Sequence, residues 1–475
     1  MTEPGAEQAC EIDGVHGRVN EPRFNIAQVL PLSPAAYALY ADNSRSELEG
    51  QLKTILLAVL AAALSPTMAT AAPATQTAST AVRIDKARID RALSQMVSGG
   101  RAAGASALVW RAGKEVYFGT AGYADREAKR PMSRDTLAQV WSMTKPVTGV
   151  ALMQLWEQGK FRLDDPLSDY LPEFARTKVY EGADSAGNPV LRPPHRPILV
   201  RDIFRHTAGL GDGPGDSYPQ KALAAADPLN PGNDLAEFSR RMATVPLAYE
   251  PGTQWRYSLG VDVQAALVEK LSGQKFEDYV RQHIFEPLRM KDTAWTQPQE
   301  RYSRLAIPYA KGSDGKLQRK NEADIRLWNF SNRKLTRGGA GLVSSLDDYM
   351  RFARMLLNGG ALDGTRVLKP ATVKLMSTDQ LDPRITERSW LPDKLNGGFG
   401  LDFAVRTGQP KNAKENRGAV GEFFWDGAWS TLFWVDPANK LTVVYFVQSE
   451  PFDGTLHHDI RSAVYGDDYL GPKGD

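Results

Sequence analysis

Cysteine and histidine are scarce in this sequence. The 475 residues include one cysteine, Cys10, which excludes an internal disulfide and a thiol site in the body of the chain. The six histidines are scattered, and none of them has the spacing of metal ligands. We therefore expect neither a metal site nor a bound cofactor.

An excess of charge of one sign is also missing. Lysine and arginine (58) nearly balance aspartate and glutamate (56), which leaves a formal net charge of +2. Proteins that bind nucleic acids or anionic membranes usually carry a basic excess or a basic patch. The composition therefore predicts neither partner. The length is sufficient for one large domain or two ordinary ones.

Long hydrophobic runs are absent as well. A membrane-spanning helix needs about 20 apolar residues, and the run at residues 55–64 falls short of that. Lys53 precedes this run and a stretch rich in Ala, Thr and Pro follows it, which is typical of a secretory signal. We interpret residues 1–51 as a non-native or disordered extension, 52–72 as a signal-peptide-like segment and 73–82 as a linker. The protein would then be exported, to the periplasm or outside the cell; if 52–72 is instead a buried Ala/Leu helix, it would be cytoplasmic.

Periodicity in the remaining sequence places strands at both ends and helices between them. A hairpin is expected at 105–119 and further strands at 422–425, 431–435 and 441–448. Helices are expected at 82–96, 142–158, 200–210 (a short helix ending in a glycine turn), 234–243, 260–272, 276–285, 346–358, 370–376 and 456–465. Residues 211–233 are rich in proline and glycine and are predicted as a loop. The pattern predicts an α/β (α+β) fold in which strands from the two ends form one antiparallel sheet, with a helical insertion beside it.

The pattern Ser-x-x-Lys is a candidate for nucleophilic catalysis, because a hydroxyl needs a base within hydrogen-bond reach. It occurs four times: Ser142/Lys145, Ser272/Lys275, Ser313/Lys316 and Ser331/Lys334. Only Ser142 opens a long apolar segment, so a helix there would place Ser142 and Lys145 on one face. The helix N-terminus would also favour a developing oxyanion. From this context alone, an ordinary helix N-cap serine is an equally good interpretation.

The serine signature of α/β-hydrolases is missing. No Gly-x-Ser-x-Gly sequence exists in the chain. The nearest approach, Gly215-Asp216-Ser217, lies in the Pro/Gly-rich segment with no strand before it. The sequence therefore argues against that class of hydrolase.

Two later motifs follow the Ser-x-x-Lys segment in order. Residues 251–258 read Pro-Gly-Thr-Gln-Trp-Arg-Tyr-Ser, and a strand-like segment carries Trp425-Asp426-Gly427. Together with Ser142 and Lys145, this set over about residues 83–467 resembles the serine β-lactamase-like superfamily of class C β-lactamases and penicillin-binding-protein relatives. The third motif is most similar to that of family VIII carboxylesterases, which have Trp-Gly-Gly or similar, so Asp426 is a departure. Lys-Thr/Ser-Gly, the β-lactamase form of this motif, is absent.

The resemblance implies a β-lactamase/transpeptidase-like fold. Its α/β part would cover about 83–140 and 338–467, its inserted all-helical part about 141–337, and the active site would lie in the groove between them. Ser142 would be the nucleophile and would form an acyl-enzyme, while Lys145 and Tyr257 would share its proton. Backbone N–H groups of Ser142 and Ala428 would hold the oxyanion.

The resemblance also suggests a pocket formed by Ser258, Leu259, Trp425, Asp426, Gly427 and Trp429. A buried lysine should lose its charge, and a tyrosine beside a cation should lose its proton more easily. Tyr257 would then be the base that activates water for release of the acyl group. His206 belongs to a familiar turn, and we expect it to have a structural role.

Three functions share these motifs. A carboxylesterase on short-chain or small esters is the first, a β-lactamase or D-Ala-D-Ala peptidase the second, and a non-catalytic penicillin-binding-like relative the third. The last is disfavoured because the three catalytic residue types are all present. Leu259 and Trp425 stand where β-lactamases carry asparagine and lysine, which favours a neutral ester over an anionic β-lactam. Three basic residues remain as a substitute cation: Arg333, Lys334 and Arg337.

Overall fold

The computed structural model describes residues 82–471, except 212, 214, 332, 390, 392–396 and 470. The expected extension at 1–51, the signal-like segment at 52–72 and nearly all of the 73–82 linker lie outside the described residues. Within the described part, no helix is long and apolar enough to cross a membrane.

An eight-stranded sheet joins the two ends of the chain. Its order is β12-β13-β14-β15-β16-β1-β2-β3, and its neighbouring strands pair antiparallel. At the centre, Ala105 lies opposite Val447. The prediction of one antiparallel sheet from both ends is confirmed. The strands are β1 (Gly104–Arg111), β2 (Lys114–Asp125), β3 (Arg130–Pro131), β12 (Gly398–Phe399), β13 (Ala404–Val405), β14 (Phe423–Asp426), β15 (Leu432–Asp436) and β16 (Leu441–Val447).

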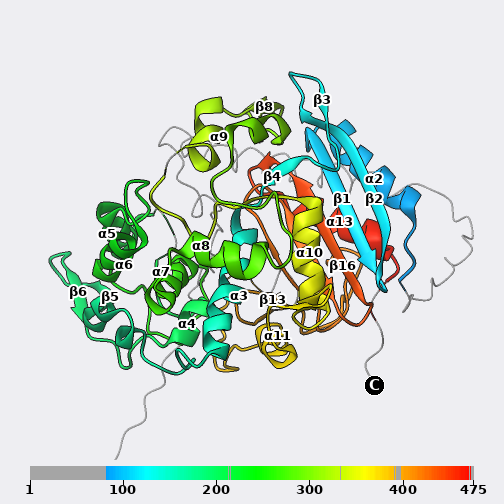
Figure 1. The fold of residues 1–475 in the computed structure, drawn as a ribbon. Helices are drawn as coiled ribbons and strands as arrows, with labels where there is room; N and C mark the ends of the chain where they lie inside the picture. Colours follow the sequence, from blue (N-terminus) through cyan, green and yellow to red (C-terminus); the bar gives the residue numbers. More distant parts are fainter. Residues whose placement is uncertain are drawn as a thin grey trace, which may run out of the picture.

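Helices cover both faces of this sheet (Figure 1). One face packs on α10 (Leu346–Leu357), and the other on α2 (Lys86–Ser98) and α13 (Gly454–Tyr465). Successive side chains of a strand point to opposite faces. Phe433 accordingly contacts Tyr349 of α10, with ring centroids 4.9 Å apart, while the next residue, Trp434, donates a hydrogen bond to Tyr465 of α13.

The chain leaves the sheet through β4 (Leu137–Gln139) and returns through β9 (Val343–Ser345), which pair with each other. Between them lies the helical part, whose central helix α3 packs against α7. Helix α3 is buried along most of its length because its residues are apolar on nearly every face. The helices here are α3 (Thr144–Glu157), α4 (Val200–Phe204), α5 (Tyr218–Ala226), α6 (Leu235–Thr244), α7 (Gly260–Ser272), α8 (Phe276–Val280), the π-helix η5 (Arg281–Phe285) and α9 (Glu322–Asn329), with 3₁₀ turns η2 (Trp141–Met143), η3 (Leu167–Asp169), η4 (Pro172–Arg176) and η6 (Gln299–Arg304).

This part is not purely helical, contrary to the expectation. It contains the hairpins β5–β6 (Val179–Ala183, Pro189–Arg192) and β7–β8 (Tyr309–Lys311, Leu317–Arg319). Asp184 closes the first hairpin by accepting hydrogen bonds from the N–H groups of Ala186 and Asn188. Helix α5 also begins inside the segment expected to be a loop, because Ser217 and Gln220 form a reciprocal capping box.

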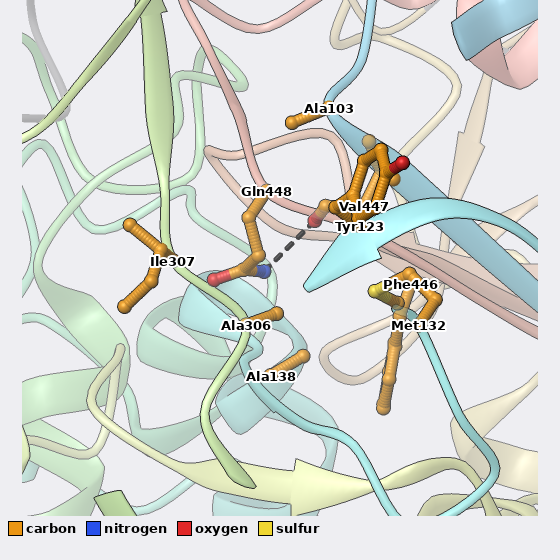
Figure 2. Close-up of a pocket in the computed structure, with 10 residues that line it drawn as sticks. Ala103, Tyr123, Met132, Ala138, Ala306, Ile307, Phe446, Val447 and Gln448 are labelled. Atoms are coloured by element: carbon orange, nitrogen blue, oxygen red, sulfur yellow. Dashed lines mark hydrogen bonds between the residues drawn. The ribbon is translucent and has the colours of Figure 1, made fainter. Parts of the chain in front are cut away.

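The remaining short elements follow β9 in the chain. They are β10 (Ala361–Leu362), β11 (Thr365–Arg366), α11 (Pro370–Met376) and β17 (Ser449–Glu450). Gln448, between β16 and β17, links the sheet to β4: its side-chain amide donates to the carbonyl of Gln139 at 3.1 Å and accepts from the N–H of Gln139 at 3.3 Å. Figure 2 shows Gln448 lining a small cavity together with Ala138 and Ile307. The chain is thus anchored just before the Ser-x-x-Lys segment.

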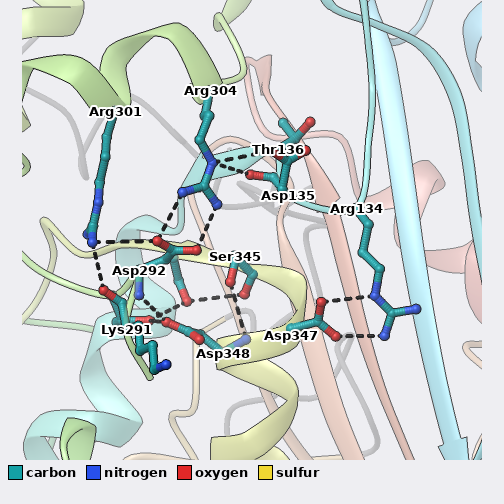
Figure 3. Close-up of polar contacts among 12 residues, drawn as sticks. Arg134, Asp135, Thr136, Lys291, Asp292, Arg301, Arg304, Ser345, Asp347 and Asp348 are labelled. Carbon is teal, nitrogen blue, oxygen red and sulfur yellow. Dashed lines mark hydrogen bonds and ion pairs between the residues drawn. The ribbon is translucent and has the colours of Figure 1, made fainter. Parts of the chain in front are cut away.

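A polar network fixes the start of α10 (Figure 3). Arg304 pairs with Asp292 at 2.7 Å, and the N–H of Asp292 donates to the carboxyl of Asp348 at 2.6 Å. Arg134 reaches Asp347 from the sheet side at 2.7 Å. Burial raises the pKa of Asp348 to about 6, and the neighbouring carboxylate of Asp292 adds to the shift.

Candidate active site

Ser142 lies in a tight 3₁₀ turn, η2, immediately before α3. The α-helix itself begins at Thr144, two residues later than expected. Trp141 adopts a left-handed conformation with φ +48°, which costs energy for a bulky side chain. Its ring is held between Trp328 and Trp429, at centroid distances of 5.1 and 4.7 Å. This packing stabilises the turn that presents Ser142.

The structure brings the three expected catalytic side chains together. The hydroxyl of Tyr257 donates to Ser142 Oγ at 2.8 Å, and Lys145 Nζ lies 3.2 Å from the same oxygen. Lys145 Nζ also lies 4.5 Å from the centre of the Tyr257 ring. All three side chains are buried. In the other three Ser-x-x-Lys pairs the lysine is exposed. Of the four pairs, only Ser142/Lys145 therefore combines a serine before a long apolar helix with a buried lysine.

A glycine-rich segment supplies the second partner of Lys145. Lys145 Nζ donates to the carbonyl of Gly339 at 2.7 Å. The N–H of Gly339 donates to Asp262 of α7, which also pairs with Arg337 at 3.2 Å. A Cβ on Gly338 would lie 2.3 Å from the carbonyl oxygen of Val261, so only glycine allows this approach. Sequence reasoning missed these contacts, although the glycine run was a signal for close backbone packing.

Burial shifts the two candidate bases in opposite directions. It lowers the pKa of Lys145 to about 7; the Asp262 carboxylate opposes this shift and the Arg337 guanidinium adds to it. Burial raises the pKa of Tyr257 above its usual range, and although its bond to Ser142 lowers it, the carboxylate of Asp426 raises it further. The expectation that Tyr257 would lose its proton more easily is therefore wrong. At neutral pH a protonated tyrosine faces a lysine that is partly an uncharged amine.

The third motif is split between the two faces of β14. Trp425 faces the site, with its ring centroid 5.5 Å from that of Tyr257. Asp426 lies on the opposite face, where its carboxylate is 3.9 Å from Nδ1 of His457 in α13. Asp426 was expected to line the pocket; strand alternation turns it away, toward α13.

The turn after β14 lies against the turn of the nucleophile. A Cβ on Gly427 would lie 2.5 Å from the carbonyl oxygen of Val140, so this glycine permits the close approach. Ala428 and Trp429 belong to a small apolar cluster with Trp141 and Trp328. Ala428 therefore lies near the nucleophile's turn, where the second oxyanion donor was expected.

Ser258 and His206 support the loop that carries Tyr257. The N–H of Ser258 donates to His206 Nδ1 at 3.2 Å, and Ser258 Oγ accepts from the N–H of Gly260 at 3.3 Å. The His206 ring lies 4.7 Å from that of Tyr257, and burial lowers its pKa well below the usual range. Ser258 is 4% exposed, and its hydroxyl forms hydrogen bonds within the protein. Leu259, the N-cap residue of α7, is 9% exposed.

The chain is similar to known proteins over most of its length. The Beta-lactamase family model matches residues 89–465. The chain is 34% identical over 385 residues to an uncharacterized protein of Mycobacterium tuberculosis, covering 80% of this chain and 93% of the relative. It is 30% identical over 406 residues to Esterase EstB of Burkholderia gladioli, covering 80% and 95%.

Among solved structures, the chain is similar to EstCE1, a hydrolase with promiscuous acyltransferase activity. The TM-score is 0.65, with 26% identity and with 80% of this chain and 98% of that chain covered. These matches confirm the fold and the resemblance to the serine β-lactamase-like superfamily.

Proposed function

We propose that this chain, which belongs to the Beta-lactamase family, is a carboxylesterase that acts on short-chain or small esters through an acyl-enzyme on Ser142. One observation carries the proposal: Ser142 Oγ lies within hydrogen-bond distance of both Lys145 Nζ and Tyr257 OH. A hydroxyl held between an amine of lowered pKa and a phenol has what nucleophilic catalysis requires.

Acylation uses Lys145 as the base. Its uncharged amine takes the proton of Ser142 while Oγ attacks the acyl carbon of the ester. The oxyanion accepts hydrogen bonds from the backbone N–H groups of Ser142 and Ala428. When the tetrahedral intermediate breaks down, Tyr257 gives its proton to the leaving alkoxide and receives one from Lys145. The net transfer is one proton, from Ser142 to the alcohol.

Release of the acyl group runs the same proton path in reverse. Water gives a proton to the oxygen of Tyr257 as the proton of Tyr257 moves to Lys145, so no free phenolate forms. The intermediate then collapses and Lys145 returns the proton to Ser142 Oγ. Tyr257 thus remains the group nearest to the water, but its raised pKa makes it a relay rather than a standing base.

The surroundings of the site favour a neutral ester over a β-lactam. Leu259 offers no hydrogen bond, and Trp425, which stands where β-lactamases carry a cation, packs its buried ring beside Tyr257. Arg337, one of the basic residues considered as a substitute cation, forms an ion pair with Asp262. A site of this kind holds its substrate through apolar burial, worth roughly 25 cal/mol per Å². Purified protein should be tested on short and long p-nitrophenyl esters, a chromogenic cephalosporin and a D-Ala-D-Ala peptide; turnover of the peptide or cephalosporin alone would contradict the proposal.

Acyl transfer to an alcohol is a second candidate. It is favoured by the likeness to EstCE1 and by the apolar cluster of Trp141, Trp328 and Trp429 beside the nucleophile. Such a surface would bind an alcohol next to the acyl-enzyme in competition with water. Adding a primary alcohol to a p-nitrophenyl butyrate assay should then yield the new ester; butyrate as the sole acyl product would exclude transfer.

We also propose export through the segment 52–72. Its support is the order of Lys53, a short apolar run and small residues. N-terminal sequencing of the protein from its native host should begin near residue 73. An intact Met1 would contradict this proposal.

A further inference from the structure

The turn between β14 and β15 has a strained residue that α13 holds in place. Ser430 has φ +66°, a left-handed conformation that is costly for a residue other than glycine. Its N–H closes the turn on the carbonyl of Gly427 at 2.9 Å. Its Oγ accepts from the N–H of Asp453, the N-cap of α13, also at 2.9 Å.

His457 of α13 reaches both ends of the same turn. Its Nε2 donates to the carbonyl of Ser430 at 2.9 Å, and its Nδ1 lies 3.9 Å from the carboxylate of Asp426. The side chains of His457 and Asp426 are 5% and 9% exposed, so both groups lie inside the protein. Phe452 packs edge-on against the imidazole at 5.0 Å and fixes its plane. The imidazole therefore spans the turn from Asp426 to Ser430.

We propose that His457 is a positioning residue, which holds this turn so that the backbone N–H of Ala428 faces the oxyanion of the acylation step. The inference rests on the proposed function, because it assigns Ala428 to the oxyanion hole. It also gives the departure at Asp426 a place: this aspartate lies beside His457, on the face of β14 away from the substrate.

Two substitutions test the two ring nitrogens of His457 one at a time. The side-chain nitrogen of glutamine can occupy the place of Nε2, whereas that of asparagine occupies the place of Nδ1. We expect His457→Asn to lower kcat for p-nitrophenyl butyrate about tenfold to a hundredfold, with KM changed less than about threefold, because misplacement by about 1 Å can cost that much. His457→Gln should keep most of the rate, since it can still donate to Ser430.

His458 is the matched control. It is the next residue of α13, and its Nε2 bonds the carbonyl of Ala413, away from the turn. His458→Gln should leave kcat and KM unchanged. Wild-type kcat in His457→Asn, or equal losses in the Asn and Gln variants, would contradict the inference.

Labelling with a fluorophosphonate separates this inference from the proposed substrate class. The phosphonyl oxygen uses the same oxyanion hole, so the labelling rate at Ser142 should follow the kcat pattern of the variants. If wild-type protein is labelled at Ser142 but hydrolyses no ester, the substrate class is wrong and the labelling rates still decide the role of His457. If His457→Asn fails to fold, His457→Met replaces it: methionine fills the space of the imidazole but cannot donate to the carbonyl of Ser430. It should show the same loss of kcat, and an unchanged kcat would overturn the inference.

Discussion

The pH dependence of kcat/KM follows directly from the environment of Lys145. A general base must be unprotonated, so activity should rise with pH through the pKa of its amine. With that pKa at about 7, kcat/KM for p-nitrophenyl butyrate should rise about tenfold from pH 6 to pH 8 and then level off. A lysine with its ordinary pKa would instead give a continued rise of about tenfold per pH unit up to pH 10.

Two substitutions should shift this rise of kcat/KM with pH, which is the acid limb of the profile, in opposite directions. The Asp262 carboxylate stabilises the charged form of Lys145 and the Arg337 guanidinium destabilises it. Asp262→Asn should therefore shift the limb to lower pH, and Arg337→Gln should shift it to higher pH. Both break a buried ion pair, which costs about 3–5 kcal/mol of stability, so the assays must be run well below each melting temperature. A limb near pH 10 in the wild type, or shifts of the same sign, would refute the assignment of Lys145 as the base.

Two further predictions concern the active site, and a third concerns Asp348 at the start of α10. Lys145→Ala and Tyr257→Phe should each lower kcat on the order of a hundredfold or more. Because both side chains act on one oxygen, the loss in the double variant should be much smaller than the product of the two single losses. A double-variant loss equal to that product would contradict this. The ratio of kcat/KM values should favour p-nitrophenyl butyrate over a chromogenic cephalosporin; the reverse would point to Arg333, whose guanidinium lies half-buried over Trp328, as a cation for the carboxylate. Finally, the folded-state pKa of Asp348 is raised, so its protonation stabilises the protein at low pH and this contribution is lost as pH rises through about 6. The free energy of unfolding in urea, taken for Asp348→Asn relative to the wild type, should therefore be about 1 kcal/mol higher at pH 8 than at pH 5. A difference of the opposite sign would be inconsistent with a raised pKa.

Much of the architecture and the centre of the site were predictable from local patterns. The sheet followed from a hairpin near one end and strand-like segments rich in aromatic and β-branched residues near the other. Ser142 stood out because a long apolar segment follows it. The ordered motifs then indicated Lys145 and Tyr257. The helix α5 was also readable, since Ser217 and Gln220 have the spacing of a capping box, but the surrounding prolines and glycines favoured a loop.

The electrostatics could not be predicted in the same way. The direction of the Tyr257 shift depends on how deeply the phenol is buried, which is set by packing between distant segments. The partners of Lys145 beyond Ser142 come from Gly339 and Asp262, which approach only in the folded chain. For Asp426 a signal existed, because Trp425 facing the site requires its neighbour to face away.

The role of Ser142 as the nucleophile can be tested by covalent labelling. Protein treated with a fluorophosphonate should be digested and analysed by mass spectrometry, with Ser142→Ala treated in parallel. A single adduct is expected, on Ser142, and none in the Ser142→Ala variant. An adduct on Ser272, Ser313 or Ser331, or labelling that persists in the variant, would contradict the account.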